Sequence, residues 1–321
     1  MRAKRSVRAT DSRRPVGEKS SASPPRKEAV GTLLALLTAV VSGISIPLNK
    51  LFLVPLDPAV FTAVRAIIIG VVFLAVSRWR GIRAPAGSWK PLLVIALLGG
   101  ALAFLLFFTG LKLTTAGRAG FLHKTLPLYV AVLGFLFLKE RLNRRFLLGM
   151  LLLFLGTIAI YFTQITPAAL WLDPQLGDAL IVGATVLWAV ENVAAKGVMN
   201  RGAHALVVQV ARMLYGGLIL MGVVLLTGRG EALLALSGGQ LVNIAISTVL
   251  LLAYVAFYYA ALQRINVSKA AALLLLAPVI SLGTGMAFLG EPAPLLQLAG
   301  SGVILAGAYL LARQPSEQRG V

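Results

Sequence analysis

Four ionisable side chains lie inside long apolar stretches of this sequence: Arg65, Lys124, Glu191 and Arg212. A charge at the centre of a membrane helix costs about 2.5–3.5 kcal/mol on insertion scales, so we expect all four to face the interior of a helix bundle. Lys196 lies nearer the end of its stretch. Together these residues are four cations and one anion, and the excess positive charge favours a ligand that carries a carboxylate or a phosphate.

Polar and aromatic side chains accompany these charges at helical spacing. Three groups of candidate lining residues each share one helical face: Trp188, Glu191 and Asn192; Tyr254 and Tyr258; and Asn49 with two serines before it. We interpret these groups as walls of a central cavity. Ordinary helix packing is the alternative for the aromatic residues. For Arg65 and Arg212 the alternative is a structural contact to helix ends or backbone carbonyls, and for Lys196 it is snorkelling to the membrane surface.

Other kinds of chemistry find little support. The chain has no cysteine and only two histidines, His123 and His204, so a metal site built from several such ligands is not expected. It also has no Walker A sequence and no G-x-G-x-x-G. The string LSGGQ at 236–240 matches an ATPase signature, but the phosphate loop with which that signature acts is missing, so we attribute the match to chance. We expect no cofactor and no enzymatic activity.

Composition indicates which elements must position these residues. Apolar residues make up 58% of the chain and charged residues 13%, and the mean hydropathy is +0.87. These values are typical of a membrane protein. Ten stretches of about 20 apolar residues are long enough to cross a bilayer as helices. They lie near 30–48, 58–77, 91–111, 116–138, 146–163, 178–198, 206–227, 242–262, 268–289 and 294–312.

The chain contains an internal duplication. Pro127, Glu140, Gly149 and Gly156 recur as Pro278, Glu291, Gly300 and Gly307, each at an offset of 151 residues. Near the start of each half, Lys50 and Lys196 pair at an offset of 146, and Arg65 and Arg212 at 147. Each repeat holds five spans, and an odd number makes the second repeat run in the opposite direction. The predicted fold is therefore an all-α membrane protein with ten transmembrane helices in two inverted five-helix repeats.

One pair of residues breaks the repeat. His123 and Lys124 align with Leu274 and Leu275, so the first repeat is polar where the second is apolar. Lys124 precedes Pro127 by three residues, and a proline at that point should kink the helix and open a cavity, as Pro278 should in the second repeat. Three roles remain for Lys124: contact with an anionic substrate, a part in proton coupling with His123, or a structural ion pair with Glu191.

Loop charges indicate the orientation. With both termini in the cytoplasm, 22 of the 30 basic residues fall on the inner side, 4 on the outer side and 4 within spans. Short cytoplasmic loops collect Lys and Arg, so this placement follows the positive-inside rule. The formal net charge of +19 is then largely a matter of membrane orientation. We expect an integral membrane protein, with the lipid bilayer as a partner and no nucleic acid.

These patterns divide the chain into five parts. Residues 1–28 form a basic cytoplasmic tail that we expect to be disordered, residues 29–163 the first repeat, 164–177 a linker, 178–312 the second repeat, and 313–321 a cytoplasmic C-terminal tail.

Motifs in both repeats resemble a known family. The ends of spans one and six read IPLNK and ENVAAK, span two begins with TAVRA, and the two P-x12-E blocks end in KERL and LGEP. In this order and spacing they are similar to the EamA branch of the drug/metabolite transporter superfamily, over residues 30–312. The resemblance implies a secondary carrier of the inner membrane, typically an exporter of amino acids or related metabolites, that works by alternating access. The pair His123–Lys124 departs from the general pattern.

Three rival functions remain. An organic-phosphate or nucleotide-sugar antiporter would also use the excess positive charge within the spans. A membrane-embedded enzyme would have only His123, Lys124 and Glu191 for its chemistry. A non-transporting membrane subunit would have no use for a charged interior.

Overall fold

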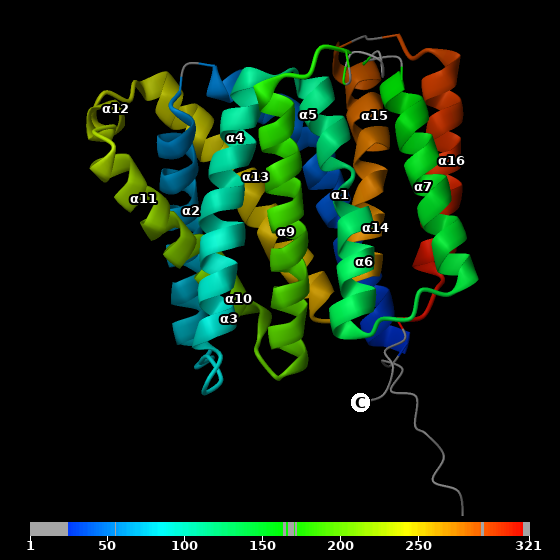
Figure 1. Cartoon of the computed structure of the whole chain (residues 1–321), viewed down its shortest axis with the longest axis horizontal. Helices are drawn as coiled ribbons and strands as arrows, with labels where there is room; N and C mark the ends of the chain where they lie inside the picture. Colours follow the sequence, from blue (N-terminus) through cyan, green and yellow to red (C-terminus); the bar gives the residue numbers. More distant parts are fainter. Residues whose placement is uncertain are drawn as a thin grey trace, which may run out of the picture.

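The structure is a computed structural model, and it describes residues 25–54, 56–162, 165, 170, 172–289 and 292–316. Ten helices in this part of the chain are long and apolar enough to cross a membrane, as predicted. They lie side by side in one bundle (Figure 1). In chain order they are α1 (Pro25–Leu53), α2 (Pro58–Trp79), α3–η1–α4 (Trp89–Val94, Ile95–Leu102, Ala103–Leu113), α5–α6 (Ala116–His123, Leu126–Leu138), α7 (Arg144–Phe162), α9 (Leu176–Asn200), α10–η2–α11 (Ala205–Val210, Ala211–Tyr215, Gly216–Leu226), α13 (Gly238–Leu262), α14–η3–α15 (Val267–Leu273, Leu274–Leu276, Ala277–Leu289) and α16 (Leu295–Ala312).

The predicted fold class of two inverted five-helix repeats is confirmed. Helix α1 begins at the lower edge of the bundle and α9, its equivalent in the second repeat, begins at the upper edge (Figure 1). Some boundaries differ from those expected. Helix α1 includes residues 25–28, and α9 begins two residues before 178. Three expected segments lie wholly or partly outside the described residues: residues 1–24, which we expected to be disordered, residues 164, 166–169 and 171 of the linker, and residues 317–321 of the C-terminal tail.

Two spans are interrupted at equivalent places. In the first repeat, α5 ends at His123 and α6 starts at Leu126, with Pro127 as its second residue. In the second, the 3-10 segment η3 separates α14 from α15, in which Pro278 is likewise the second residue. A proline has no N–H and its ring clashes with the carbonyl four residues earlier, so the α-helical ladder cannot continue through it.

The two repeats meet along a seam of four glycines on α7 and α16. A Cβ atom added to Gly156 would lie 2.5 Å from the carbonyl oxygen of Gly300, and one added to Gly300 would lie 2.8 Å from that of Gly156. About two turns further along, a Cβ on Gly307 would lie 2.7 Å from the carbonyl oxygen of Gly149. Only residues without a side chain allow this approach, so the glycines of the duplicated motif serve helix packing.

Charged residues near helix ends make contacts that repeat across the duplication. Arg118 forms an ion pair with Asp178 at the start of α9. Its repeat equivalent Lys269 pairs with Glu28 at the start of α1, at 2.7 Å. Glu140 accepts hydrogen bonds from the backbone N–H of Val267 and Ser268 and so caps the start of α14. The matching residue of the second repeat, Glu291, lies outside the described residues.

The lysine pair Lys50 and Lys196 also has symmetric contacts. Lys50 Nζ donates to the carbonyl of Leu111 at 2.6 Å, and Lys196 Nζ donates to that of Leu262 at 2.7 Å. These two carbonyls belong to equivalent residues near the ends of α4 and α13. The positive charge is favourable at a helix C-terminus. Snorkelling was the alternative expected for Lys196, but its Nζ bonds to a carbonyl at the end of α13.

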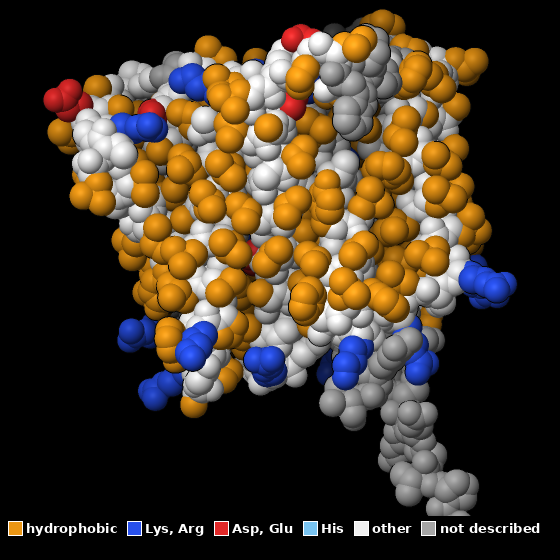
Figure 2. Space-filling view, viewed as in Figure 1, with side chains coloured by type: hydrophobic (Ala, Val, Ile, Leu, Met, Phe, Trp, Pro, Cys, Tyr) orange, Lys and Arg blue, Asp and Glu red, His pale blue; other side chains and the backbone are white. Residues whose placement is uncertain are grey.

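The surface matches a membrane environment. Figure 2 shows apolar side chains over the middle of the molecule and Lys and Arg gathered at its lower edge, where α1 begins. Large apolar residues such as Leu136, Leu151 and Leu298 are between 46% and 60% exposed. Ten membrane-length helices that expose such an apolar belt are stable only against lipid, so the protein is an integral membrane protein.

Candidate functional site

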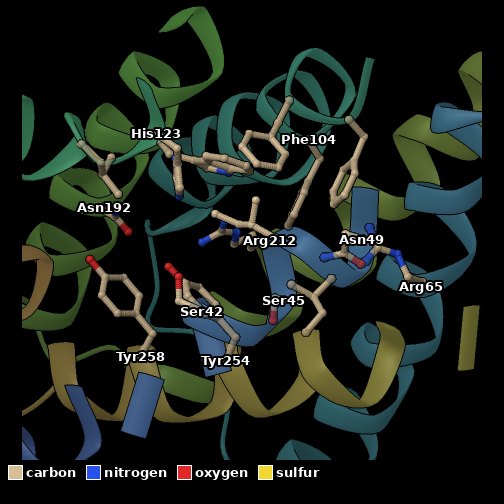
Figure 3. A pocket seen from close by; sticks show the side chains of 16 residues that line it. Ser42, Ser45, Asn49, Arg65, Phe104, His123, Asn192, Arg212, Tyr254 and Tyr258 are labelled. Atoms are coloured by element: carbon tan, nitrogen blue, oxygen red, sulfur yellow. The ribbon is translucent and has the colours of Figure 1, made fainter. Parts of the chain in front are cut away.

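A cavity lies between the two repeats (Figure 3), and none of its lining residues belongs to α7 or α16. Its volume is about 80 Å³. One water needs roughly 10–15 Å³ on this measure, so the cavity holds several waters or a small solute group. Its lining residues come from both repeats: Ser42, Ser45, Ile46, Asn49, Arg65, Phe104, Phe107, Phe108, His123, Leu126, Trp188, Asn192, Arg212, Leu251, Tyr254 and Tyr258.

Most of the expected site residues meet in this cavity. The expected residues that line it are Asn49, Arg65, His123, Trp188, Asn192, Arg212, Tyr254 and Tyr258. Two further expected residues, Lys124 and Glu191, are buried but lie outside its lining. Glu191 is separated from the cavity by Arg212 and Tyr259, and Lys124 is separated from it by Ser42.

Glu191 is enclosed by an ion pair and a tyrosine. Its carboxylate accepts from Arg212 Nη1 at 3.2 Å and from the Tyr259 hydroxyl at 2.5 Å. Arg212 Nη1 also donates to the Tyr259 oxygen at 2.5 Å. In the described part of the chain no ion pair joins Glu191 to Lys124, so the structural alternative proposed for that lysine is replaced by a pair with Arg212.

Two glycines make room for this network. Gly99 and Gly100 lie in the π-helical segment η1. A Cβ on Gly99 would lie 2.1 Å from Glu191 Cγ, and one on Gly100 would lie 2.0 Å from the carbonyl oxygen of Arg212. Arg212 itself belongs to the second π-helical segment, η2. Short π-helical segments often occur at functional sites, and here η1 and η2 pack against each other beside the cavity.

The other buried arginine is held by different contacts. Arg65 Nη1 donates to Ser247 Oγ at 2.5 Å, and Arg65 Nε donates to the carbonyl of Phe61 at 3.0 Å. Its guanidinium carbon lies 3.8 Å from the centre of the Phe61 ring and 4.5 Å from that of Phe108. Ser247 in turn donates to Asn49 Oδ1. Backbone and aromatic contacts fix the guanidinium, and it has no acidic partner among the described residues.

Four buried polar atoms of the lining residues have no hydrogen-bond partner in the described part of the chain. They are Arg65 Nη2, Arg212 Nε, Asn192 Oδ1 and the Tyr258 hydroxyl. A buried polar group without a partner costs about 1–3 kcal/mol, so such groups need a bound water or ligand. Two of these atoms are guanidinium donors, one is an amide acceptor, and the hydroxyl can serve either way. This combination suits a small anion that also carries a donor group.

An aromatic wall closes one side of the cavity. The rings of His123, Phe107 and Trp188 form a triangle: the centre of the His123 ring is 5.3 Å from that of Phe107 and 5.2 Å from that of Trp188, and the last two are 5.1 Å apart. Its Nδ1 is 3.5 Å from Thr185 Oγ1. The Trp188 indole donates to the carbonyl of Gly99 at 3.1 Å, which fixes the ring. The wall therefore offers apolar surface next to the polar groups.

Three phenylalanines of this wall were not among the expected lining residues: Phe104, Phe107 and Phe108. Phe107 and Phe108 align with Tyr258 and Tyr259 at the offset of 151, so the duplication could have predicted these two residues. Phe104 aligns with Val255 and had no such signal.

Lys124 lies one hydrogen bond away from the cavity. Its Nζ donates to Ser42 Oγ at 3.2 Å, and Ser42 lines the cavity. The residue follows the end of α5, at the interruption before Pro127, and the turn there directs its side chain toward α1. No group of three metal-binding side chains occurs in the part of the chain that the structure describes.

Comparisons with known proteins identify the family of the two repeats. The family model described as the EamA-like transporter family matches residues 29–162 and 175–313, which are the two repeats. A protein of Methanothermobacter thermautotrophicus, named an uncharacterized transporter, is 26% identical over 87% of this chain and 85% of its own length. A protein of Salmonella typhimurium, named a probable amino-acid metabolite efflux pump, is 27% identical over 86% of this chain and 93% of its own.

A solved structure has the same fold. A protein known by a crystal structure superposes with a TM-score of 0.69 at 19% sequence identity, and the match covers 87% of this chain and 95% of that one.

Proposed function

The chain belongs to the EamA-like transporter family, and from this premise we propose that it is a secondary carrier that exports amino acids or related small metabolites by alternating access. The observation that carries the proposal is the cavity between the two inverted repeats, with its four buried polar atoms that lack partners. A substrate in this cavity would contact both halves, so rocking of one half against the other would expose it to each side in turn.

The lining favours a carboxylate on a partly apolar molecule. The free Nη2 of Arg65 and the free Nε of Arg212 can each donate to an anionic oxygen. Asn192 Oδ1 can accept from an ammonium or amide N–H, and the ring of Trp188 can pack on the rest of the molecule. An amino acid or an acylated amino acid has these three parts. The Salmonella typhimurium relative, named for amino-acid metabolite efflux, supports the same substrate class.

Lys124 and His123 extend the site. Lys124 adds a third positive charge behind Ser42 and contributes to the attraction of the anionic group. His123 lines the cavity and serves proton coupling. A His123→Gln variant should then show a changed dependence of flux on pH. An unchanged pH–flux profile would remove the coupling role.

The protein acts in the cell inner membrane with both termini in the cytoplasm. The Lys and Arg side chains at the edge where α1 begins support this orientation (Figure 2).

Flux into proteoliposomes tests the proposed function. Radiolabelled amino acids should cross unchanged, and Arg65→Gln should slow them by about tenfold or more, the loss expected for one charge-assisted hydrogen bond of roughly 1.5–3 kcal/mol. Arg229→Gln is the matched control, because that arginine is 46% exposed at the surface. Lys124→Gln should weaken substrate binding and Lys124→Arg should partly retain it.

Other results would favour the rivals. Flux only in exchange for phosphate would support an organic-phosphate or nucleotide-sugar antiporter, and chemical conversion of the substrate would support an enzyme. Equal flux in Arg65→Gln and wild type would mean that the substrate does not bind in this cavity.

A further inference from the structure

A second hollow lies at the edge of the bundle where α1 begins, and none of its lining residues belongs to the glycine seam. Its volume is about 1110 Å³, and it opens between α2, the start of α3 and α10. The residues that line it are Leu74, Ser77, Arg78, Gly81, Ile82, Arg83, Ala84, Pro85, Gly87, Ser88, Trp89, Leu92, Leu93, Ala96, Val207, Val210 and Tyr215. We call it the α2–α3 groove.

The groove has two chemically different ends. Arg78 and Arg83 are exposed at the loop end. Ala96 and Tyr215 mark the other end, and Ala96 is seven residues beyond Trp89 along one span. At a rise of 1.5 Å per residue the groove therefore extends about 10 Å along the helices. Between its ends the walls are apolar, and they include Leu93, which is 46% exposed.

The cations at the loop end have no counter-charge. In the described part of the chain, neither Arg78 nor Arg83 has an ion-pair partner. The sequence from 58 to 113 contains no Asp or Glu, and Arg80 and Lys90 add two further exposed cations beside the groove. Figure 2 shows Lys and Arg side chains at the lower edge beneath α2 and α3.

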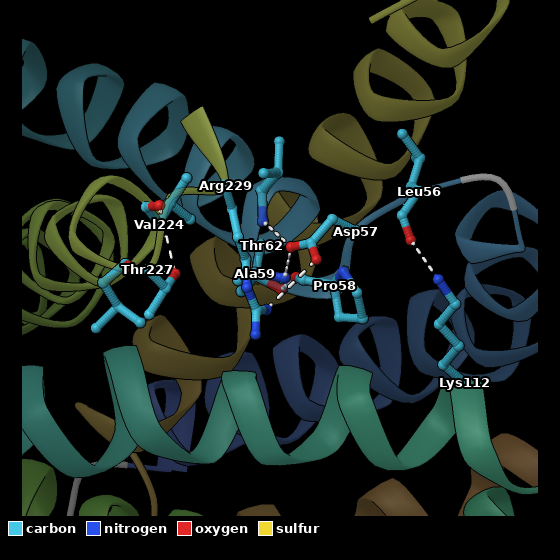
Figure 4. A network of polar contacts seen from close by, with 11 residues as sticks. Leu56, Asp57, Pro58, Ala59, Thr62, Lys112, Val224, Thr227 and Arg229 are labelled. Carbon is cyan, nitrogen blue, oxygen red and sulfur yellow. Dashed lines mark hydrogen bonds and ion pairs between the residues drawn. The ribbon is translucent and has the colours of Figure 1, made fainter. Parts of the chain in front are cut away.

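The inverted repeat supplies an internal comparison. At the opposite edge, Asp57 caps α2 through the N–H of Ala59 and also pairs with Arg229 at 3.4 Å (Figure 4). Its repeat equivalent, at the offset of 147 that relates Arg65 to Arg212, is His204. His204 caps α10 in the same way, through the N–H of Leu206, but it carries no negative charge to offer an arginine. At the position equivalent to Asp57, the edge that holds the groove therefore has no acid.

We propose that the α2–α3 groove binds an anionic phospholipid of the surrounding leaflet. The phosphate of the headgroup would take hydrogen bonds from Arg78 and Arg83, and the first part of an acyl chain would lie along the apolar wall. Trp89 is 63% exposed and Tyr215 51% exposed, and such rings settle at the boundary between headgroups and acyl chains. Basic pockets between membrane helices bind lipid headgroups by this combination of charge and apolar surface.

Native mass spectrometry of the intact, detergent-purified protein tests this site. Phosphatidylglycerol and phosphatidylcholine would be titrated separately, and apparent affinities compared. Each arginine near an anionic headgroup contributes about fivefold in affinity, so Arg78→Gln with Arg83→Gln should weaken phosphatidylglycerol binding by about 25-fold. Phosphatidylcholine, whose choline cancels the charge of its phosphate, should lose much less. Arg145→Gln is the matched control, because Arg145 is an exposed cation at the same edge that does not line the groove.

A second variant tests the apolar wall without touching charge. Leu93→Trp, at an exposed position, should fill the groove and weaken phosphatidylglycerol binding while both arginines remain. Equal binding of the two lipids by wild type would overturn the proposal. So would an equal loss in Arg145→Gln, which would mean general attraction to the basic edge. Displacement of the lipid by millimolar inorganic phosphate would mean that the groove takes a free phosphate.

Discussion

The ion pair of Glu191 with Arg212 makes a sharp prediction about stability. Both side chains are almost fully enclosed, with exposed fractions of 0% and 5%, and they contact each other at 3.2 Å. Glu191→Gln keeps the shape of the side chain and can still accept from Tyr259. It removes the charge that balances Arg212, and the described residues around the network offer no other acid.

The expected size of the effect follows from the burial. Removal of one partner of a buried ion pair costs about 3–5 kcal/mol, because the remaining charge stays buried without compensation. Arg212→Gln should cost a similar amount for the same reason. The double variant holds two neutral amides, which can hydrogen-bond to each other. Its free energy of unfolding should therefore be closer to that of wild type than the sum of the two single changes, with a coupling energy of about 1–3 kcal/mol.

Thermal unfolding in detergent, followed by tryptophan fluorescence, measures this cycle. A second cycle pairs Glu191→Gln with Lys124→Gln and serves as the control, since Lys124 donates to Ser42 and not to the carboxylate. Its coupling energy should be the smaller of the two. If the Lys124 cycle gave the larger coupling, or if Glu191→Gln left the unfolding temperature unchanged, the assignment of Arg212 as the partner of Glu191 would be wrong.

Three further predictions concern orientation, the seam and a cap. Reporter fusions should place the 139–145 loop and the C-terminus in the cytoplasm and the 164–177 loop outside; a 164–177 reporter inside would refute the orientation. Gly156→Leu should lower the unfolding temperature because its side chain would meet a backbone carbonyl at 2.5 Å, whereas Gly222→Leu, with nothing within 4 Å, should not. Burial and two neighbouring arginines lower the pKa of His204, whose neutral ring caps α10. In the unfolded chain His204 binds a proton near pH 6.5, so the free energy of unfolding should fall as pH drops below about 6.5. The fall should be at most about 0.5–2 kcal/mol, the contribution of one helix cap. His204→Asp should remove this part of the pH dependence.

The duplication made most of the fold predictable. Helix number follows from the length of apolar stretches, and inversion follows from an odd number of spans per repeat. The helix interruptions at Pro127 and Pro278 follow from the chemistry of proline. The close approach of Gly156 and Gly300 follows from the absence of a side chain. Each of these features depends on residue type and position alone.

The partners inside the bundle were harder to predict. Helical spacing correctly places Trp188 and Asn192 at the cavity, but it wrongly adds Glu191, which lies against Gly99 and outside the lining. That direction depends on the π-helical turn around Gly99, for which the sequence has no clear signal. Lys124 lies at a helix interruption, where the direction of a side chain depends on the local turn and not on helical periodicity. Predictions from spacing fail at such places because the period itself changes.

The seam between α7 and α16 has the form of a contact between two copies of one subunit. Gly156 meets Gly300 and Gly149 meets Gly307, and Gly300 and Gly307 are the repeat equivalents of Gly149 and Gly156. Each side therefore presents the same surface to the other, as in a twofold symmetric dimer. Such a contact needs only one sequence to specify it. The two halves, supplied as separate polypeptides, would therefore still carry the complementary glycine surfaces through which α7 contacts α16.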